Sequence, residues 1–558
     1  MSAREALAVG ETCQPSTSAF FPKQSPRMST EPAARTSMTR RPSTGQKIVP
    51  SATFRRTSTT QRGSVSGVGR KSETNAGKHF TRTQDDPLPP HATKRDMAKC
   101  LSELEYKFNL TPQRMRMIVD SFIEVLERGL AAPGQEVPMI PTYVFGYPTG
   151  HEKGPYLAVD LGGTNLRVCH VELEGEGKFE ITQTKYRLTE EQKHAEGQDL
   201  FDFCAECLGR FITDHYGDED GNVDLEEPIP LGFTFSYPCL QEGINHGVLI
   251  RWTKGFGAPN VEGHDVSAMF AKSLEKFEVP VKMTALINDT TGTLIASAYV
   301  DPSTRAGIIF GTGCNAAYME KVSAITKLKG LEVPADAEMA INCEWGAFDS
   351  TTHEHLPRTA YDIIIDETSN KPGEQAFEKM IAGLYLGEIF RLVMCEMIDE
   401  GVLFLGQETY KVEKPYGFDT AFLSLIESDT TEELLTVTGL FAHFYSLTTT
   451  TSERQFFKRL AQLIGTRAAR LSACGIAAIV SKQNLLDEGC SIATDGSLYN
   501  QYPKFPERLA EGLVDIFGEK GKGITTHHAE DGSGVGAAVI AAMTKERIAA
   551  GLPVSCKA

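Results

Sequence analysis

The chain has 558 residues, of which 41% are hydrophobic and 23% charged, and its formal net charge is −17. These proportions are those of a globular protein with more than one folded unit, and they exclude a fibrous or wholly disordered chain. Residues 1–95 carry 16 Lys and Arg against 6 Asp and Glu, a net charge of +10, so the rest carries −27. An acidic folded part disfavours nucleic acid as a partner, because phosphates repel it.

Nothing in the sequence predicts a membrane span or secretion. No apolar run approaches the ~18 residues of a membrane-spanning helix, and no apolar stretch near the N-terminus has the pattern of a signal peptide. The 12 cysteines lie largely in apolar segments, which is typical of reduced thiols in the cytoplasm. We interpret Cys204 and Cys207, a Cys-x-x-Cys pair, as two thiols on one helix face rather than as metal ligands.

Residues 1–95 hold 26 Ser and Thr and almost no apolar periodicity, so we predict a disordered basic extension. Ser43 and Ser58 each stand two positions after a pair of arginines, which is the pattern of basophilic kinase sites. The extension is therefore a candidate for phosphorylation or for binding a regulatory protein, and a solvated tail is the plainer alternative. Its Arg and Ser content also leaves mitochondrial or nuclear association open, although Glu5 and Glu11 are atypical of a transit peptide.

From Asp96 onward the sequence indicates an α/β protein. Helical spacing begins at Met97 and again at Met115, and a strand series begins at Tyr156. Strands and helices then alternate to the end of the chain, which favours α/β architecture. Two long loops are expected, over residues 174–198 and 408–419.

The first glycine turn follows the apolar strand Tyr156–Leu161. Its residues are Gly162, Gly163, Thr164 and Asn165, and a second strand comes directly after them. This pattern predicts a β-hairpin. Glycine lets backbone N–H groups approach an anion closely and Thr164 adds a hydroxyl, so the turn is a candidate phosphate site. A plain hairpin turn is the alternative.

A second glycine turn repeats this arrangement. Residues 307–318 read as strand, then Gly311-Thr312-Gly313, then strand. The repeat indicates a duplicated lobe, in which two facing turns could hold a polyphosphate from both sides. The pattern is neither a Walker loop nor a Rossmann fingerprint, because each turn leads back into a strand.

A third glycine cluster, Asp531–Gly536, opens a small-residue helix over 537–543. Two interpretations stay open for it. The N-terminus of a helix with Gly and Ser is a natural seat for an anion or nucleotide. Glycines at a helix start also allow tight packing against another helix.

The pair Asn288-Asp289 stands between a strand-like segment, Val279–Ile287, and an apolar helical one, Leu294–Val300. We expect Asp289 to be the N-cap of the helix. A carboxylate fixed at a strand end and facing a cleft could also accept the proton of a substrate hydroxyl. The two roles are compatible, because a capping aspartate can still offer its second oxygen.

Three more charged residues stand in unusually apolar or aromatic surroundings. Lys254 lies between Trp252 and Phe256 and could bring charge to a phosphoryl group, although a lone lysine is more often a surface residue. Glu344 directly precedes Trp345, too apolar a place for an idle surface charge. Glu378 lies on a probable helix, where a solvated helix partner is the alternative. Each carboxylate can accept two charge-assisted hydrogen bonds from a ligand.

Seven motifs, in order and at compatible spacing, make the chain resemble the hexokinases, and most of all the fungal hexose kinases. They are Leu161–Asn165, Leu231–Pro238, Ile250–Phe256, Asn288–Gly292, Phe310–Asn315, Asn342–Phe348 and Asp495–Ser497. The resemblance runs from about residue 96 to residue 550, four-fifths of the sequence. It implies an α/β fold of the actin-like ATPase (ribonuclease H-like) type, duplicated, with two lobes around a central cleft.

We place the large lobe at residues 96–155 and 289–536 and the small lobe at residues 156–288 and 537–558. The resemblance further implies phosphorylation of glucose, and of fructose and mannose, at the 6-hydroxyl. ATP is the donor and Mg²⁺ the cofactor, and the reaction is the first step of glycolysis. Sugar binding is expected to close the lobes before transfer, which excludes water.

Carried over position by position, the resemblance makes Asp289 the catalytic base, with Lys254 also catalytic, and lets Asp160 reach Mg²⁺ through water. The hexose would be held by Ser236, Thr253, Lys254, Asn288, Asp289, Asn315, Glu344 and Glu378. ATP would be held by Gly162, Gly163, Thr164, Asn165, Arg167, Gly311, Thr312, Gly313, Gly496, Ser497 and Ser533.

Two other functions use related folds. A sugar sensor without turnover would be expected to lack Asp289, Lys254 or a Gly-Thr turn, and the sequence keeps all of them. An ATPase of the actin or heat-shock-protein type would not carry the predicted sugar contacts. The sequence leaves open the preferred hexose, product inhibition and the oligomeric state.

Overall fold

The computed structural model describes residues 96–555 except 164, 219–221, 254 and 335, and these residues belong to one compact unit. The predictions for the basic extension, including Ser43 and Ser58, fall outside the described residues. So do those for Thr164 and Lys254.

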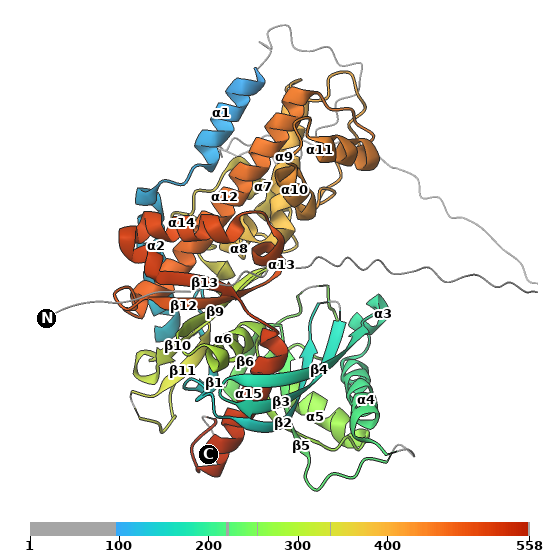
Figure 1. Cartoon of the computed structure of the whole chain (residues 1–558), viewed down its shortest axis with the longest axis vertical. Coiled ribbons are helices and arrows are strands. Elements are labelled where there is room, and N and C mark those ends of the chain that lie inside the picture. Colours follow the sequence, from blue (N-terminus) through green and yellow to red (C-terminus); the bar gives the residue numbers. More distant parts are fainter. Residues whose placement is uncertain (1–95, 164, 219–221, 254, 335, 556–558) are drawn as a thin grey trace, which may run out of the picture. The chain divides into compact units, whose positions relative to one another are not determined.

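Two mixed sheets form the framework of the described residues (Figure 1). The six-stranded sheet has the order β1-β11-β10-β9-β12-β13, the five-stranded sheet has the order β4-β3-β2-β5-β8, and β6 pairs with β7. The strands are β1 (Ile140–Phe145), β2 (Lys153–Leu161), β3 (Asn165–Gly175), β4 (Lys178–Arg187), β5 (Ile229–Phe235), β6 (Cys239–Gly243), β7 (His246–Leu249), β8 (Val281–Ile287), β9 (Thr304–Phe310), β10 (Cys314–Lys321), β11 (Glu338–Asn342), β12 (Cys490–Asp495) and β13 (Ile524–His528).

Helices cover both sheets, and most of the chain between β11 and β12 is helical. The α-helices are α1 (Met97–Phe108), α2 (Pro112–Ala131), α3 (Glu190–Lys193), α4 (Gly197–Tyr216), α5 (Val266–Lys276), α6 (Asp289–Val300), α7 (Ala360–Thr368), α8 (Ala376–Ile381), α9 (Gly383–Asp399), α10 (Thr420–Ser428), α11 (Leu435–Leu440), α12 (Thr451–Lys482), α13 (Ser497–Gln501), α14 (Phe505–Phe517) and α15 (Gly532–Ala549). Short helical turns lie at η1 (Val322–Ala324), η2 (Trp345–Ala347), η3 (Phe441–Tyr445) and η4 (Gly518–Gly523).

The two sheets repeat one topology. In the five-stranded sheet β4, β3 and β2 pair antiparallel, and β2, β5 and β8 pair parallel. In the six-stranded sheet β11, β10 and β9 pair antiparallel, and β9, β12 and β13 pair parallel. The predicted duplication is therefore present, with β1 as an additional strand on the second copy. Two of the predicted lobe boundaries, after residues 155 and 536, fall inside β2 and α15, and the boundaries stay a prediction.

Helices α6 and α15 pack unusually closely. A Cβ atom on Gly536 would lie 2.2 Å from the carbonyl oxygen of Gly292, and one on Gly532 would lie 2.7 Å from Thr293 Oγ1. No side chain fits at either glycine without moving backbone. Of the two interpretations of the third glycine cluster, tight helix packing is therefore present, and the anion seat stays a prediction.

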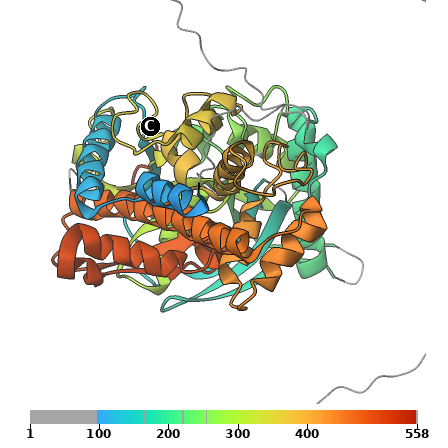
Figure 2. The same ribbon diagram turned by 90° about the horizontal axis from the view of Figure 1, so that it is seen from above.

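Helix α12 is the central helix of the second half, flanked by α1 and α14 (Figure 2). A capping box of Thr450 and Glu453 begins it. Among the described residues it has the length and composition of a membrane-spanning helix, which the sequence analysis did not expect of any segment. However, 83% of its most apolar window is buried inside the protein, as expected for a core helix.

One predicted loop is wrong and one is confirmed. Residues 174–198 contain β4 and α3 as well as the start of α4, whereas residues 408–419 contain neither helix nor strand. Strand β4 lies at the sheet edge and has no fully buried residue, so only the short alternation of Phe179 and Ile181 with polar neighbours marks it in the sequence.

The Cys-x-x-Cys pair is structural. Cys204 and Cys207 are free, buried thiols on α4. Burial raises the pKa of Cys204 and raises that of Cys207 to about 11, so both are protonated and unreactive at neutral pH. The interpretation as two packed thiols is confirmed.

Replacing Lys327 by methionine should lower the free energy of unfolding by about 1.5–3 kcal/mol. Its Nζ donates to the carbonyl oxygens of Gly129, Pro138 and Met139, at 2.7 Å to Gly129 and to Met139, and so ties the end of α2 to the start of β1. Chemical denaturation of both variants is the measurement. Lys329→Met, at an exposed position two residues away, is the control and should change stability by less than about 0.5 kcal/mol. Equal losses of unfolding free energy in Lys327→Met and Lys329→Met would contradict a stabilising role for these hydrogen bonds.

Candidate active site

The first glycine turn is a hairpin, as predicted. Strand β2 ends at Leu161, which pairs with Leu166 of β3 in antiparallel register. The Gly162 N–H donates to the Asn165 carbonyl oxygen at 3.2 Å and closes the turn. The hydroxyl of Tyr237 donates to the Gly162 carbonyl oxygen at 3.1 Å and anchors it.

Three predicted ATP or metal residues meet beside this turn. Arg167 Nη2 lies 3.0 Å from Asp160 Oδ2, and the Ser533 hydroxyl donates to the same oxygen at 2.8 Å. Arg167 also donates to Ser533 and pairs with Asp531, which precedes α15. Sequence reasoning missed Asp531, although it is the acid at the head of the third glycine cluster.

The charge of Asp160 links this cluster to Asp289. Burial raises the pKa of Asp160. Its contacts with Arg167 and Ser533 partly offset that rise, whereas the Asp289 carboxylate adds to it. Asp289 also adds to the raised pKa of Tyr237, which is chiefly due to burial. Asp289 therefore lies within electrostatic reach of the first glycine turn.

The second glycine turn is also a hairpin. Phe310 of β9 pairs with Cys314 of β10, and the Gly311 N–H donates to the Gly313 carbonyl oxygen at 2.9 Å. The end of β12 packs directly against it. Gly496 has a φ of +110°, and a Cβ atom there would lie 2.4 Å from the Phe310 carbonyl oxygen. The structure thus brings the predicted ATP residues Gly311 and Gly496 together.

A cavity of about 360 Å³ opens beside the second turn. Thr312 and Ser497, both predicted to bind ATP, line it together with Tyr416 and Tyr502. The Leu384 N–H donates to the Thr312 carbonyl oxygen at 3.2 Å, which fixes the start of α9 against the turn. Sequence reasoning missed the lining residues Leu384, Tyr416 and Tyr502, because they belong to no glycine or acid motif.

Asp289 lies at the N-terminus of α6, one position later than predicted. Asn288 is the N-cap, and its Oδ1 accepts from the Thr290 N–H at 2.9 Å and from the Thr290 hydroxyl at 2.6 Å. The prediction that Asp289 caps the helix is wrong, because the asparagine amide oxygen already fills that role. Asp289 is the first residue of the helix and is partly exposed.

An acid–amide cluster, made of Asn315, Asn342 and Glu344, lies next to this helix start. Asn342 Oδ1 accepts from Asn315 Nδ2 at 2.7 Å and lies 3.5 Å from Thr290 Oγ1. Glu344 Oε1 accepts from both Asn315 and Asn342 at 3.0 Å. Sequence reasoning missed Thr290 and Asn342. The signal for Asn342 was a polar residue at the end of the apolar strand β11.

Glu378 joins this cluster to the second glycine turn. Its Oε2 accepts from the Cys314 N–H at 2.9 Å, one residue before Asn315. A Cβ atom on Gly313 would lie 2.6 Å from the same oxygen, so a side chain there would displace the Glu378 carboxylate from the turn. Glu378 lies on α8, as its predicted helix requires.

The Ser236 and Thr253 segments pack together. Ser236 lies between Phe235 and Tyr237, whose ring centroids are 5.8 Å and 4.9 Å from that of Trp252. Thr253 directly follows Trp252, whose indole N–H donates to the Ala258 carbonyl oxygen at 2.8 Å. This aromatic packing fixes both predicted sugar contacts to the same part of the protein.

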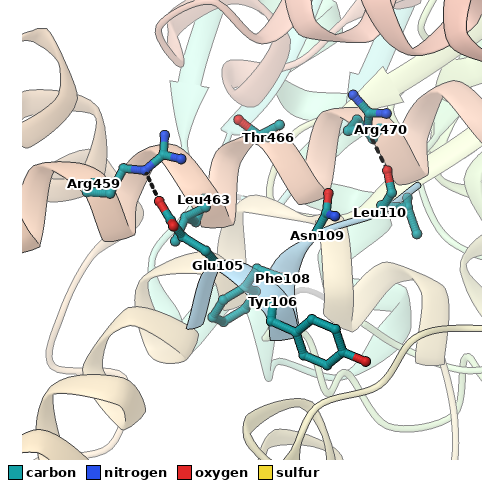
Figure 3. Close-up of a pocket in the computed structure, with 9 residues that line it drawn as sticks. All are labelled: Glu105, Tyr106, Phe108, Asn109, Leu110, Arg459, Leu463, Thr466 and Arg470. Carbon is teal, nitrogen blue, oxygen red and sulfur yellow. Dashed lines mark hydrogen bonds and ion pairs between the residues drawn. The ribbon is translucent and has the colours of Figure 1, made fainter. Parts of the chain in front are cut away.

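A second cavity, of about 400 Å³, lies between α1 and α12 (Figure 3). Arg459 pairs there with Glu105 at 2.8 Å, and Arg470 Nε donates to the Leu110 carbonyl oxygen at 3.1 Å. None of the predicted site residues lines this cavity. Its cations already have partners, so it shows no built anion site.

Comparison with known proteins agrees with this geometry. Residues 100–299 and 305–543 each match a sequence model of the hexokinase family. The hexokinase of Kluyveromyces lactis is 48% identical over 84% of this chain and 99% of that protein. Hexokinase-2 of Saccharomyces cerevisiae is 47% identical over 84% of this chain and 98% of that protein. A solved hexokinase of Schistosoma mansoni, complexed with glucose, has a TM-score of 0.72 at 34% identity and covers 80% of this chain and 100% of that chain.

The duplicated sheets, the two glycine hairpins and the acid–amide cluster define the class of ATP-dependent sugar kinases. The chain belongs to the hexokinase family. It is a phosphotransferase that phosphorylates hexose with ATP in glycolysis, on the duplicated actin-like fold. The predicted family, fold class and enzyme class are confirmed.

Proposed function

We propose that the protein transfers the γ-phosphoryl group of ATP to the 6-hydroxyl of glucose, with Asp289 as the general base. The observation that carries the proposal is the position of Asp289. It acts on the charge of Asp160 beside the first glycine turn, and it begins the helix whose Thr290 contacts the acid–amide cluster. A carboxylate there can accept the hydroxyl proton while the phosphoryl group approaches from the turns.

The acid–amide cluster suits a sugar. Asn315 and Asn342 both donate to Glu344 Oε1, which orients that carboxylate for hydroxyl donors. The other proposed sugar contacts are Ser236, Thr253, Lys254, Asn288 and Glu378. A site of this kind rejects analogues that lack one of the hydroxyls bound by this cluster, because the carboxylate then loses its partner. The similar hexokinase solved with glucose supports glucose as the hexose, with fructose and mannose as further substrates.

The glycine turns suit the ATP phosphates. Backbone N–H groups in a tight turn form an anion-binding concavity, and Arg167 adds a positive charge beside the first turn. The cavity next to Thr312 and Ser497 has the aromatic lining that a nucleoside prefers. Gly162, Gly163, Thr164, Asn165, Gly311, Gly313, Gly496 and Ser533 complete the proposed ATP contacts.

The residues present fit Mg²⁺ delivered with ATP. No group of three or more His, Cys, Asp or Glu residues among the described ones could hold a metal ion by itself. Mg²⁺ in kinases keeps several waters and uses one or two carboxylates together with substrate phosphates. Asp160 is the proposed carboxylate, held through Oδ2 by Arg167 and Ser533. When bound, Mg²⁺ would neutralise charge on the transferred phosphoryl group.

Water competes with the sugar hydroxyl as a nucleophile. We therefore propose that sugar binding closes the two lobes before transfer, which excludes water and assembles the site. We also propose the cytoplasm as the location, supported by the buried, protonated thiols. Phosphorylation of Ser43 and Ser58, or a regulatory protein bound at the extension, stays a prediction.

A coupled assay of ADP formation tests the function. Glucose, fructose and mannose should each support turnover, and N-acetylglucosamine tests how far the site tolerates a changed 2-substituent. The control is 6-deoxyglucose, which lacks the acceptor hydroxyl and should inhibit without turning over. ADP formation at the same rate without sugar, or with 6-deoxyglucose, would contradict the proposal.

A further inference from the structure

One ion pair joins the loop that carries Thr253 to the segment that carries Glu378. Arg251 Nη1 lies 2.6 Å from Glu374 Oε2. The neighbours of the two residues pack in different apolar cores. Trp252, next to Arg251, packs in the core on the α4–α5 face of the five-stranded sheet, whereas Phe377, close to Glu374, packs in the other core. The pair therefore bridges the two halves of the candidate site.

The base of Arg251 is fixed. The Trp252 N–H donates to Glu262 Oε1 at 2.7 Å, and the Trp252 ring stacks on Phe256 with centroids 5.3 Å apart. The Phe256 N–H in turn donates to the Thr253 carbonyl oxygen at 3.1 Å. These contacts join Arg251 rigidly to the loop that holds Thr253.

The base of Glu374 is fixed as well. Asp366 Oδ1 accepts from the Gly373 N–H at 3.0 Å and from Lys379 Nζ at 2.7 Å. Lys379 also donates to the Lys371 carbonyl oxygen at 2.7 Å, which pins the turn before α8. Glu378 lies one residue before Lys379, so these hydrogen bonds hold the turn at Glu374 and the proposed sugar contact Glu378 in a fixed relative position.

Charges from both halves meet around this pair. Burial lowers the pKa of Lys371, and Arg251 lowers it further, while Glu374, Glu262 and Glu378 oppose that change. Arg251 and Glu262 come from the Thr253 side, and the other three charges come from the Glu378 side. Arg251, Glu374 and Glu378 all lie within electrostatic reach of the same side chain, Lys371.

We propose that Arg251 and Glu374 are positioning residues for hexose binding, and that their ion pair holds the Thr253 loop against the Glu378 segment. The inference rests on the proposed sugar contacts. Neither residue is a proposed ATP contact or the proposed base, so we expect the pair to act on sugar affinity and to leave the transfer step unchanged.

Arg251→Gln and Glu374→Gln should each raise KM for glucose about two- to fivefold, the range of a partly exposed ion pair, with kcat unchanged. Glu367→Gln, an exposed glutamate on the preceding helix, is the matched control and should leave both constants at wild-type values. In roughly 1 M salt the difference between wild type and the two variants should shrink, because screening weakens the pair. A loss of folded protein would instead lower the apparent kcat and leave KM unchanged, so the split between KM and kcat identifies the positioning role.

Charge exchange makes the test decisive. Arg251→Glu and Glu374→Arg should each raise KM for glucose, and the double exchange should restore it. The proposal is overturned if the single variants match Glu367→Gln or if the exchange restores nothing. Glu378→Gln distinguishes failure of the positioning role from failure of the proposed sugar site. If Glu378→Gln raises KM while the Arg251 and Glu374 variants keep wild-type KM, only the positioning role is removed. Unchanged KM in all of these variants removes the assigned sugar site as well.

Discussion

Asp289→Asn is expected to lower kcat by at least ~10², the contribution typical of a positioned general base. Asparagine keeps the size of the side chain but cannot take the proton of the sugar hydroxyl. The helix should not be disturbed, because Asn288 rather than Asp289 is the N-cap of α6. Sugar affinity should therefore change much less than kcat. Steady-state kinetics and a glucose titration of tryptophan fluorescence measure the two quantities separately.

Asp301→Asn is the matched control for this variant. Asp301 lies at the opposite end of α6, where its carboxylate accepts from the Ser303 N–H at 2.9 Å. It is expected to turn over at close to the wild-type rate. Near-wild-type kcat in Asp289→Asn would refute the assignment of the base, and a comparable loss in Asp301→Asn would point to damage of the helix instead.

Arg467→Met is expected to lower the free energy of unfolding by about 3–5 kcal/mol, because it leaves a buried carboxylate without its partner. Arg467 donates to both oxygens of Asp362, at 2.7 and 2.8 Å, and the two side chains are 1% and 2% exposed. Asp362 also accepts from the Thr359 N–H at 2.7 Å and so begins α7. Denaturant unfolding measures the loss.

The control comes from the same helix. Arg459 of α12 pairs with Glu105, and both side chains are more than a third exposed, so Arg459→Met should cost at most about 1 kcal/mol. Adding Asp362→Leu to Arg467→Met should recover part of the loss, because no unpaired charge is then buried. An equal cost in the two single arginine variants would contradict this account of the pair.

Much of the fold was predictable because local patterns and tertiary structure agree. Both glycine hairpins and the strand–helix step at Asp289 lie where apolar strands break at small or polar residues. Strand β4 was missed, since it lies at the sheet edge among mostly polar residues and only Phe179 and Ile181 show the apolar alternation of a strand. Helix α12 passes a test for membrane helices because a core helix is apolar for the same reason, removal from water.

The candidate site was predictable only where a motif marked it. Asn315 and Glu344 came from motifs and Glu378 came from the family resemblance, and the structure brings them together. Asn342 begins a motif and Asp531 begins the third glycine cluster, but neither was assigned a role, because the sequence does not show that they contact Asn315 and Arg167. Asp531 meets Arg167 across 364 residues, and no local pattern encodes such a contact.

The most direct test is a crystal structure with glucose and a non-hydrolysable ATP analogue. The account predicts that a carboxylate oxygen of Asp289 lies within about 3 Å of the sugar 6-hydroxyl, with both glycine turns against the phosphates. A 6-hydroxyl held instead by Glu344 or Glu378, with Asp289 out of hydrogen-bonding reach, would contradict it.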